Sequence, residues 1–280
     1  QTNFGVVQKT RCCMILIGIL LGTLVAGIGS VWLAAALSFG SLARYTQHML
    51  SLAAGALMAT ALLQLLPEAL ESHIEPHSLF RVLLGGLVFF FLLDKAELWH
   101  HGHEHHHEHY EHQHQHQHPH HPAPQAGSWS VLVGDSVHCF GDGILIASAF
   151  MADMRLGAIA ALAVLVHEVP HHMGDLAVLR SSGTANKRMA VVKVSLAGAV
   201  TALGGVLGYW LVDTLREYLP YFLVLAASSF VYVALADLIP QLQKRLTLRE
   251  TSAQIFWLAL GIGVVALLGS VMGHGHGHTH

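Results

Sequence analysis

The chain has 280 residues, of which 53% are hydrophobic and 11% carry a charge, and its formal net charge is −3. This composition, with a mean hydropathy of +0.52, excludes an ordinary soluble domain, and no basic face suggests a nucleic-acid partner. Three cysteines, two of them adjacent, imply no disulfide framework. We therefore predict a polytopic membrane protein.

Several apolar runs reach the length of about 20 residues that a helix needs to cross a bilayer. The first run is too long for the core of a signal peptide and is followed by no convincing cleavage site. We predict an all-α fold with eight transmembrane helices in a single domain spanning residues 1–280. The predicted helices cover residues 13–38, 47–70, 79–98, 128–151, 157–180, 189–213, 219–242 and 252–272.

Residues 99–127 interrupt the apolar pattern between the third and fourth predicted helices. Histidine dominates this segment, together with glutamine, glutamate and proline, so the segment cannot bury a core and is predicted to be a disordered loop. The chain also ends in alternating glycine and histidine over residues 273–280, either as a native metal-binding tail or as an addition. The thirteen loop histidines are His100, His101, His103, His105, His106, His107, His109, His112, His114, His116, His118, His120 and His121.

Basic residues in the loops predict the orientation of the chain. With both termini outside, the cytoplasmic segments hold nine lysines and arginines and the outer segments hold five. The bias is modest, and Lys9 and Arg11 oppose it locally. We predict external termini and a cytoplasmic histidine-rich loop, in a plasma membrane or a bacterial inner membrane.

Residues 61–68 and 234–241 carry a similar pattern at the ends of the second and seventh predicted helices, AxxQLLPE and AxxDLIPQ. These helices run in opposite directions, so the pattern indicates an inverted repeat of helices 1–3 and 6–8 around helices 4 and 5, as in many transporters. The alternative is a chance recurrence of a Leu-x-Pro helix end in leucine-rich sequence.

The fourth and fifth predicted helices carry an unusual number of ionisable side chains. Each such group costs roughly 2.5–3.5 kcal/mol at the centre of a membrane, so an unpaired set is unfavourable. Histidines mixed with carboxylates suit a divalent metal ion such as Zn²⁺, Fe²⁺, Mn²⁺ or Cd²⁺. The residues are Asp135, His138, Asp142, His167, Glu168, His171, His172 and Asp175.

Helical spacing places Asp135, His138 and Asp142 on one stripe of the fourth helix, with Cys139 one step round. On the fifth helix, one stripe carries the ionisable residues 167, 171 and 175 and a neighbouring stripe carries 168 and 172. If the two helices face each other, the core of the metal site consists of His138, Asp142, Glu168 and His171, with Cys139 or His167 at its margin.

Pro170 removes a backbone donor and predicts a kink beside these ligands. Gly141, Gly143 and Gly174 are predicted to keep the neighbourhood narrow and to let helices approach each other. Together these features predict a polar path past the site.

Other residues are weaker candidates for second-shell or path positions. They can equally be capping, interhelical or packing residues, because such residues are common near helix ends and in apolar helices. This set comprises Asp135, His172, Asp175, Gln64, Glu68, Asp237 and Met58.

Two motifs carry a resemblance to a known family. Residues 138–143, HCFGDG, resemble the His-Asn-Phe-x-Asp-Gly motif of ZIP (Zrt/Irt-like) metal transporters, and Asp135 matches an acidic residue that often precedes it. Residues 167–175, HEVPHHMGD, are similar to the His-Glu-x-Pro-His-Glu-x-Gly-Asp signature of the histidine-rich eukaryotic-type subfamily. Cys139 departs from the usual Asn, and His172 departs from the usual Glu.

The resemblance implies a paired metal site. Positions matching His138, Asp142 and His171 hold the first metal, and positions matching Cys139 and Glu168 hold the second, with Asp142 and His171 able to bridge. A thiol at position 139 is expected to harden or abolish the second site, or to turn its selectivity toward softer ions.

The resemblance also implies the function. It implies import of divalent metal ions, most often zinc, into the cytoplasm by a homodimeric transporter that is not an enzyme and has no organic cofactor. Helices 1, 4, 5 and 6 are expected to carry the metal against helices 2, 3, 7 and 8.

Two rival functions remain. His167, Glu168 and His171 form the His-Glu-x-x-His pattern of zinc metalloproteases, in which Glu168 is the general base. Pro170 counts against a protease because that motif needs an undistorted helix. A zinc exporter of the six-helix cation-diffusion type also carries histidine-rich loops, but eight spans and the lack of a folded domain after the last span argue against it.

Overall fold

The computed structural model describes residues 2–38, 46–102, 127–181, 186–242 and 247–273, and the regular structure within these ranges is helical throughout. The all-α prediction is therefore confirmed. The elements are α1 (Thr2–Leu24), η1 (Val25–Gly29), α2 (Ser30–Ser38), α3 (Thr46–Thr60), η3 (Ala61–Leu65), α4 (Leu66–Leu70), α5 (Pro76–Gly102), α6 (Gly127–Ala152), α7 (Met154–Ser181), α8 (Lys187–Thr214), η4 (Arg216–Tyr218), α9 (Leu219–Leu242) and α10 (Leu248–Gly273).

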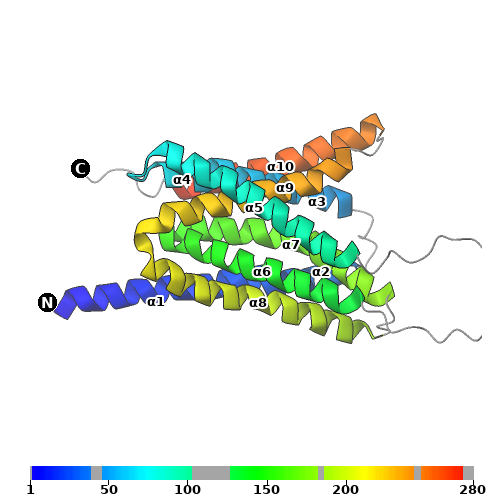
Figure 1. Cartoon of the computed structure of the whole chain (residues 1–280), viewed down its shortest axis with the longest axis horizontal. Helices are drawn as coiled ribbons and strands as arrows, with labels where there is room; N and C mark the ends of the chain where they lie inside the picture. Colours follow the sequence, from blue (N-terminus) through cyan, green and yellow to red (C-terminus); the bar gives the residue numbers. More distant parts are fainter. Residues whose placement is uncertain (1, 39–45, 103–126, 182–185, 243–246, 274–280) are drawn as a thin grey trace, which may run out of the picture.

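The long helices run back and forth along one common direction (Figure 1). Two continuous helical segments, called rods below, contain a π-helical turn. These turns are η1 between α1 and α2, and η3 between α3 and α4. The start of α1 and the end of α10 lie at the same end of the bundle, as an even number of crossings requires. Most predicted helix ends lie within a few residues of the observed ones.

Two helices extend beyond their predicted bounds. The predicted first span, residues 13–38, agrees with the apolar segment Cys12–Ser38, and the helix itself continues back to Thr2 because nothing in the polar lead breaks it. The predicted histidine-rich loop starts too early, since α5 continues through residues 99–102. The loop histidines beyond Gly102 and the tail after Gly273 lie outside the described residues.

Seven helical segments of the described chain are long and apolar enough to cross a membrane. They are Cys12–Ser38, Gln47–Leu70, Pro76–Leu93, Met154–Ala177, Lys187–Thr214, Arg216–Ala236 and Leu248–Val271. Helix α6 is not among them, although its 26 residues span about 39 Å at 1.5 Å per residue. The eighth crossing therefore stays a prediction, as does the inverted repeat.

The helices fall into two groups. In the first, α6, α7 and α8 pack against one another and against the α1–η1–α2 rod. In the second, α3 packs against α10 and α9, and α9 packs against α5. The groups meet where α3 contacts α7 and α9 contacts α6. This arrangement has the same membership as the two sets of helices that the family resemblance implies.

Glycines at the helix contacts allow backbones to touch. A methyl group on Gly143 of α6 would overlap the Thr201 carbonyl oxygen of α8, and one on Gly204 would overlap the Phe140 carbonyl oxygen. In the second group, Gly55 of α3 meets the backbone of α10 in the same way. Close approach through small residues is typical of helices that pack within a membrane.

The large apolar side chains face outward. Trp32, Leu196 and Val271 are among the most exposed residues, each with about two thirds of its surface accessible, whereas alanines and serines fill much of the interior. Since a soluble protein buries its large apolar side chains, this inverted distribution indicates a surface that faces lipid.

Local signals position the ends of the helices. Asp153 accepts hydrogen bonds from the backbone N–H groups of Arg155 and Leu156, which caps α7. Thr247 and Glu250 form a reciprocal capping box at the start of α10. The α7 cap fixes the residue at which α7 begins, and hence the position along the bundle of the residues at the middle of α7.

Candidate metal centre

The ionisable residues of the two central helices meet halfway along them. His138 lies 11 residues after the start of α6, and Glu168 lies 14 residues after the start of the 28-residue α7. Helices α6 and α7 pack side by side. The site is therefore about 20 Å from either end of α7, at 1.5 Å per residue.

One set of ligand atoms, the His138 group, consists of His138, His167 and Glu168, whose donor atoms all lie within 4.8 Å of one another. His138 Nε2 is 3.4 Å from Glu168 Oε1 and 3.4 Å from His167 Nε2. Asp142 Oδ2 lies 3.8 Å from His138 Nε2, and the His171 ring stacks on His138 at 5.6 Å between centroids. These five side chains line one side of the α6–α7 contact.

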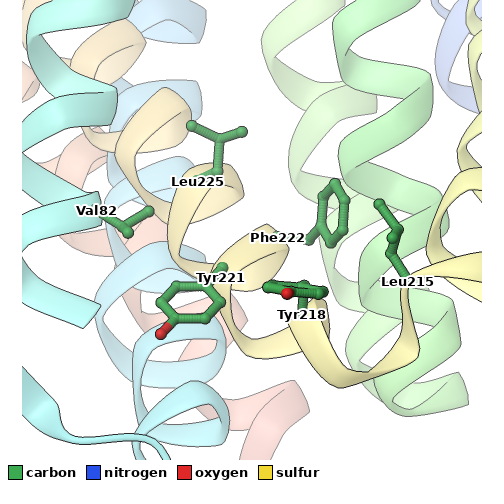
Figure 2. Close-up of a pocket in the computed structure, with 6 residues that line it drawn as sticks. All are labelled: Val82, Leu215, Tyr218, Tyr221, Phe222 and Leu225. Atoms are coloured by element: carbon green, nitrogen blue, oxygen red, sulfur yellow. The ribbon is translucent and has the colours of Figure 1, made fainter. Parts of the chain in front are cut away.

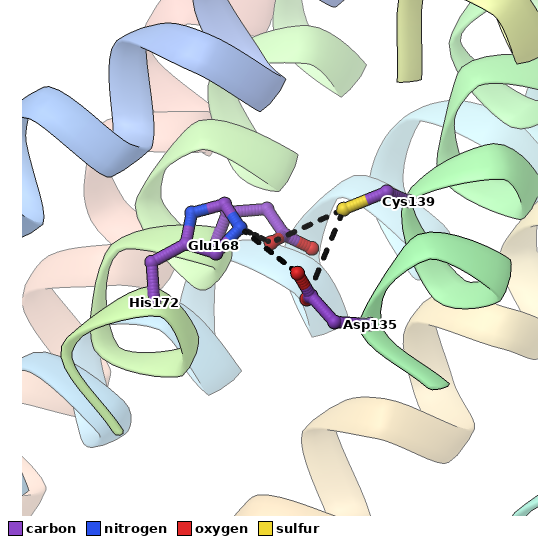
Figure 3. A group of neighbouring side chains, drawn as sticks. All are labelled: Asp135, Cys139, Glu168 and His172. Carbon is purple, nitrogen blue, oxygen red and sulfur yellow. Dashed lines mark hydrogen bonds and ion pairs between the residues drawn. The ribbon is translucent and has the colours of Figure 1, made fainter. Parts of the chain in front are cut away.

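A second set, the Cys139 group, consists of Asp135, Cys139, Glu168 and His172, again within 4.8 Å of one another (Figure 3). Cys139 Sγ is 3.9 Å from Asp135 Oδ1 and 4.0 Å from Glu168 Oε2. His172 Nε2 is 3.2 Å from Glu168 Oε2 and 3.8 Å from Asp135 Oδ2. Figure 3 shows the four side chains pointing toward one common centre.

Most side chains of the two groups are deeply buried, yet several of their polar atoms form no hydrogen bond. Glu168 and His172 are at most 1% exposed, and Asp142 is 4% exposed. Asp142 Oδ2, Glu168 Oε1 and His172 Nε2 are buried and form no hydrogen bond. Buried polar atoms are normally hydrogen-bonded. Here, carboxylate oxygens and imidazole nitrogens instead face one another at 3.2–3.8 Å, an arrangement that is typical of a cation site.

The family model described as a ZIP zinc transporter matches residues 94–269, well over half of the chain and the whole of both motifs. The chain belongs to the ZIP zinc transporter family. The membership that the two motifs predict is thereby confirmed.

Known ZIP proteins include similar relatives in several animals. The chain is 28% identical to zinc transporter ZIP4 of Rattus norvegicus over 275 residues, covering 78% of this chain and 41% of the relative. It is 32% identical to zinc transporter ZIP10 of Danio rerio over 148 residues, covering 50% of this chain and 17% of the relative. It is 31% identical to zinc transporter foi of Drosophila melanogaster over 53% of this chain and 21% of the relative. The chain thus spans less than half the length of these relatives.

Within this ZIP chain, the predicted core residues His138, Asp142, Glu168 and His171 do come together. His167, which the spacing places at the margin, lies inside the His138 group. Asp135, which is predicted only as a second-shell or path residue, lies beside Cys139 and His172.

The glycines beside the site behave differently from one another. Gly143 provides the predicted close helix contact, but a Cβ atom added to Gly141 or Gly174 would have no other atom within 4 Å, so both face open space. The prediction that they narrow the neighbourhood is wrong for these two. His171, one turn before Gly174, is exposed, so the His138 group has one accessible side. Pro170 lies inside α7, which continues as one helix to Ser181.

Of the weaker candidates, Asp135 and His172 belong to the Cys139 group, and the others lie elsewhere. Glu68 has Asp153 and Arg155 among its charged neighbours. These two residues lie at the N-terminal end of α7, away from the metal-binding residues at the middle of that helix. The Gln64 side chain lies against Gly269 of α10, and Met58 packs against the apolar core. Asp175 is half-buried and belongs to neither group, and the side chain of Asp237 lies outside the described set.

Sequence reasoning missed one residue that shapes the site. Ser30, at the start of α2, is fully buried and its Oγ lies 2.9 Å from His172 Nδ1. A serine within an apolar helix gives no signal by itself, because its contact depends on how the first rod is placed against α7.

A separate pocket of about 290 Å³ lies near the end of the bundle where η4 joins α8 to α9 (Figure 2). Its lining is apolar, so it offers no ligand set for a metal ion. It is lined by Val82, Leu215, Tyr218, Tyr221, Phe222 and Leu225.

Proposed function

We propose that this chain imports divalent transition-metal ions, zinc in preference to iron, manganese or cadmium, into the cytoplasm. The observation that carries the proposal is the His138 group, in which imidazole and carboxylate donors from α6 and α7 meet at the middle of two membrane-length helices. The relatives named as zinc transporters support the choice of ion.

The transported ion binds His138, His167 and Glu168, with Asp142 and His171 as additional ligands. Three neutral imidazoles and two carboxylates are a donor set that suits zinc. His171 is exposed, and a Cβ atom at Gly141 or Gly174 would have no other atom within 4 Å, so the ligand set is not enclosed on every side as in a structural zinc site.

The division of the bundle into two groups supports a transport cycle. The ligands lie on α6 and α7 of the first group, while α3 and α9 of the second group pack against those same helices. Movement of the first helix group, which contains α6 and α7, relative to the second, which contains α3 and α9, would carry the ion without remaking its ligand shell. The proposal includes external termini, a cytoplasmic histidine-rich loop and a homodimer, in a plasma membrane or a bacterial inner membrane.

The geometry argues against the protease interpretation of the His-Glu-x-x-His pattern. Glu168 Oε1 faces His138 and Glu168 Oε2 faces His172, so both of its oxygens lie among donor atoms rather than beside a free position for water. Export by a cation-diffusion mechanism lacks support from a family match. The direction of transport is therefore the part of the proposal that an experiment must decide.

Expression in zinc-starved cells tests the function directly. Cells that produce the protein are expected to regain growth and to accumulate radiolabelled zinc, and to become more sensitive to excess zinc. Protection from excess zinc would contradict import and favour export. Cleavage of a membrane substrate without any zinc accumulation would favour the protease.

Deletion of residues 100–121 is expected to leave zinc transport competent and to change only its regulation or apparent affinity. The physical reason is that the proposed ligands lie on α6 and α7, whereas this segment follows the membrane span of α5. Uptake is measured in cells with equal amounts of protein in the membrane. A length-matched variant with the thirteen histidines changed to glutamine separates the role of the histidines from that of the linker, and a correctly inserted deletion without uptake would refute the expectation.

A further inference from the structure

Ser30 connects the first rod to the middle of α7. It is the first residue of α2, directly after the π-helical turn η1, and both Ser30 and His172 are fully buried. Helix α2 packs against α7, and the Ser30 hydroxyl oxygen lies 2.9 Å from His172 Nδ1. The first rod therefore touches α7 one helical turn after the proposed ligand Glu168.

The π-helical turn η1 directs Ser30 toward His172. A π-helical turn takes up one residue more than an α-helical turn, which rotates every later side chain by about 100° around the helix axis. The turn is held against α8 by a contact between backbones, because a methyl group on Gly27 would overlap the Gly198 carbonyl oxygen. A methyl group on Gly198 would in turn lie 2.6 Å from the Gly27 carbonyl oxygen. Helix α8 therefore fixes the position of the Gly27 carbonyl.

The directions of the hydrogen bonds around Ser30 follow from the number of protons. Ser30 Oγ donates to the Gly27 carbonyl oxygen at 2.6 Å, which uses the single proton of the hydroxyl. The contact between Ser30 Oγ and His172 Nδ1 is then a hydrogen bond only if Nδ1 carries a proton and donates it. In the neutral ring, Nε2 is left without a proton and can only accept.

The unprotonated edge of the His172 ring faces Glu168. His172 Nε2 lies 3.2 Å from Glu168 Oε2 and forms no hydrogen bond, and Figure 3 shows the ring directed at the carboxylate. An ionised Glu168 also has no proton to give, so the histidine leaves the lone pairs of this carboxylate free. The other oxygen, Oε1, faces His138 Nε2 at 3.4 Å. In this tautomer of His172, Glu168 keeps its capacity to bind a cation.

Without Ser30, the opposite tautomer of His172 would be favoured. The Nδ1 proton would lose its acceptor, whereas a proton on Nε2 would find Glu168 Oε2 at 3.2 Å. The ring stays neutral, because one proton moves from Nδ1 to Nε2. The resulting hydrogen bond to a charged carboxylate is roughly twice as strong as one between neutral groups, and it competes with a metal ion for the same oxygen.

We propose that Ser30 is a positioning residue for the transport site. By holding His172 as the Nδ1–H tautomer, Ser30 keeps Glu168 free of a hydrogen bond from the ring and available to the transported ion. The inference rests on the proposed function, in which Glu168 binds that ion. It assigns to the first rod a contribution to metal affinity, although none of the proposed metal ligands lies on this rod.

Uptake of radiolabelled zinc over a range of zinc concentrations tests the role of Ser30. Ser30→Ala is expected to raise the KM for zinc about 10-fold or more with little change in the maximal rate, because loss of a group that orients a metal site costs about 10–100-fold. Ser30→Thr keeps a hydroxyl that can bond back to the Gly27 carbonyl and is expected to retain the wild-type KM.

Ser148→Ala is the matched control. Ser148 is also fully buried and also donates to a carbonyl of its own helix, that of Ile144 at 2.9 Å. Among the described residues, no histidine contacts the Ser148 hydroxyl. This variant loses the same kind of helical hydrogen bond and should keep the wild-type KM.

A double-variant cycle shows whether Ser30 acts through His172. His172→Ala is expected to retain zinc uptake, because His172 is not a proposed ligand of the transported ion. In this background no ring is left to orient, so the further change Ser30→Ala is expected to alter the KM by less than about 2-fold. A purely structural role of Ser30 would give the same increase in KM with and without His172. Thermal unfolding of the detergent-solubilised protein shows that each variant is folded.

Several results would overturn the proposal. These are a wild-type KM in Ser30→Ala, a raised KM in folded Ser30→Thr, an equal effect of Ser30→Ala in both backgrounds, and loss of uptake in folded His172→Ala. Each of them leaves zinc uptake by the wild-type protein intact. Wild-type protein that takes up no zinc would refute the proposed function instead, so the two failures are distinguishable.

Discussion

Replacing His138 with alanine is expected to reduce zinc uptake to the level of cells that lack the protein, a loss of more than about 100-fold. Loss of a residue that merely orients a metal ligand costs about 10–100-fold, and His138 is itself a proposed ligand that faces Glu168 and His167 at 3.4 Å. His171→Ala is expected to have a similar effect, because its ring stacks on His138. Radiolabelled zinc uptake, normalised to protein in the membrane, measures both.

The control for these variants is His73→Ala, which removes an exposed histidine in the connection between α4 and α5. This variant should transport at the wild-type rate. The side chain of His138 is 29% exposed, so its truncation should not unfold the bundle. Wild-type uptake in both His138→Ala and His171→Ala would refute the assignment of the His138 group as the transport site.

The second large effect is expected at the contact between α6 and α8. In Gly143→Ala the new methyl group would overlap the Thr201 carbonyl oxygen and approach the backbone of Gly204 and Gly205, which cannot rotate away. Overpacking of this kind costs about 1–3 kcal/mol, which corresponds to a fall of roughly 2–10 °C in the melting midpoint. Thermal unfolding of the detergent-solubilised protein measures it.

Gly141→Ala is the matched control, two residues away on the same helix. No atom lies within 4 Å of a Cβ at position 141, and alanine favours a helix over glycine by about 1 kcal/mol. Its melting midpoint should be unchanged or higher. Equal midpoints for the two variants would show that α6 and α8 do not touch at Gly143.

Composition and periodicity predict the helices well. The second, fourth and seventh predicted runs match the observed rods almost to the residue, because apolar length and polar loops mark where a chain enters and leaves a membrane. The early start of α1 at Thr2 escaped prediction, since hydropathy detects the apolar part of a helix and not its polar extension. The π-helical turns η1 and η3 also escaped, because they depend on packing between rods.

The site shows where sequence reasoning stops. Spacing identifies His138, Asp142, Glu168 and His171 as neighbours because residues three or four apart share a helix face. Spacing alone does not decide which neighbouring side chain each residue on that face contacts. Asp135 is separated by about 60° from His138 and by about 40° from Cys139 around an ideal helix. Which of them it joins depends on the rotation of α6 against α7.

The buried side chains of the two groups can be counted as charges. Asp135, Asp142 and Glu168 bring three negative charges when ionised, and the imidazoles bring none when they act as ligands. One dication leaves the set at −1. Since net charge is costly at membrane depth, binding of a dication lowers the electrostatic cost of keeping these carboxylates ionised between α6 and α7.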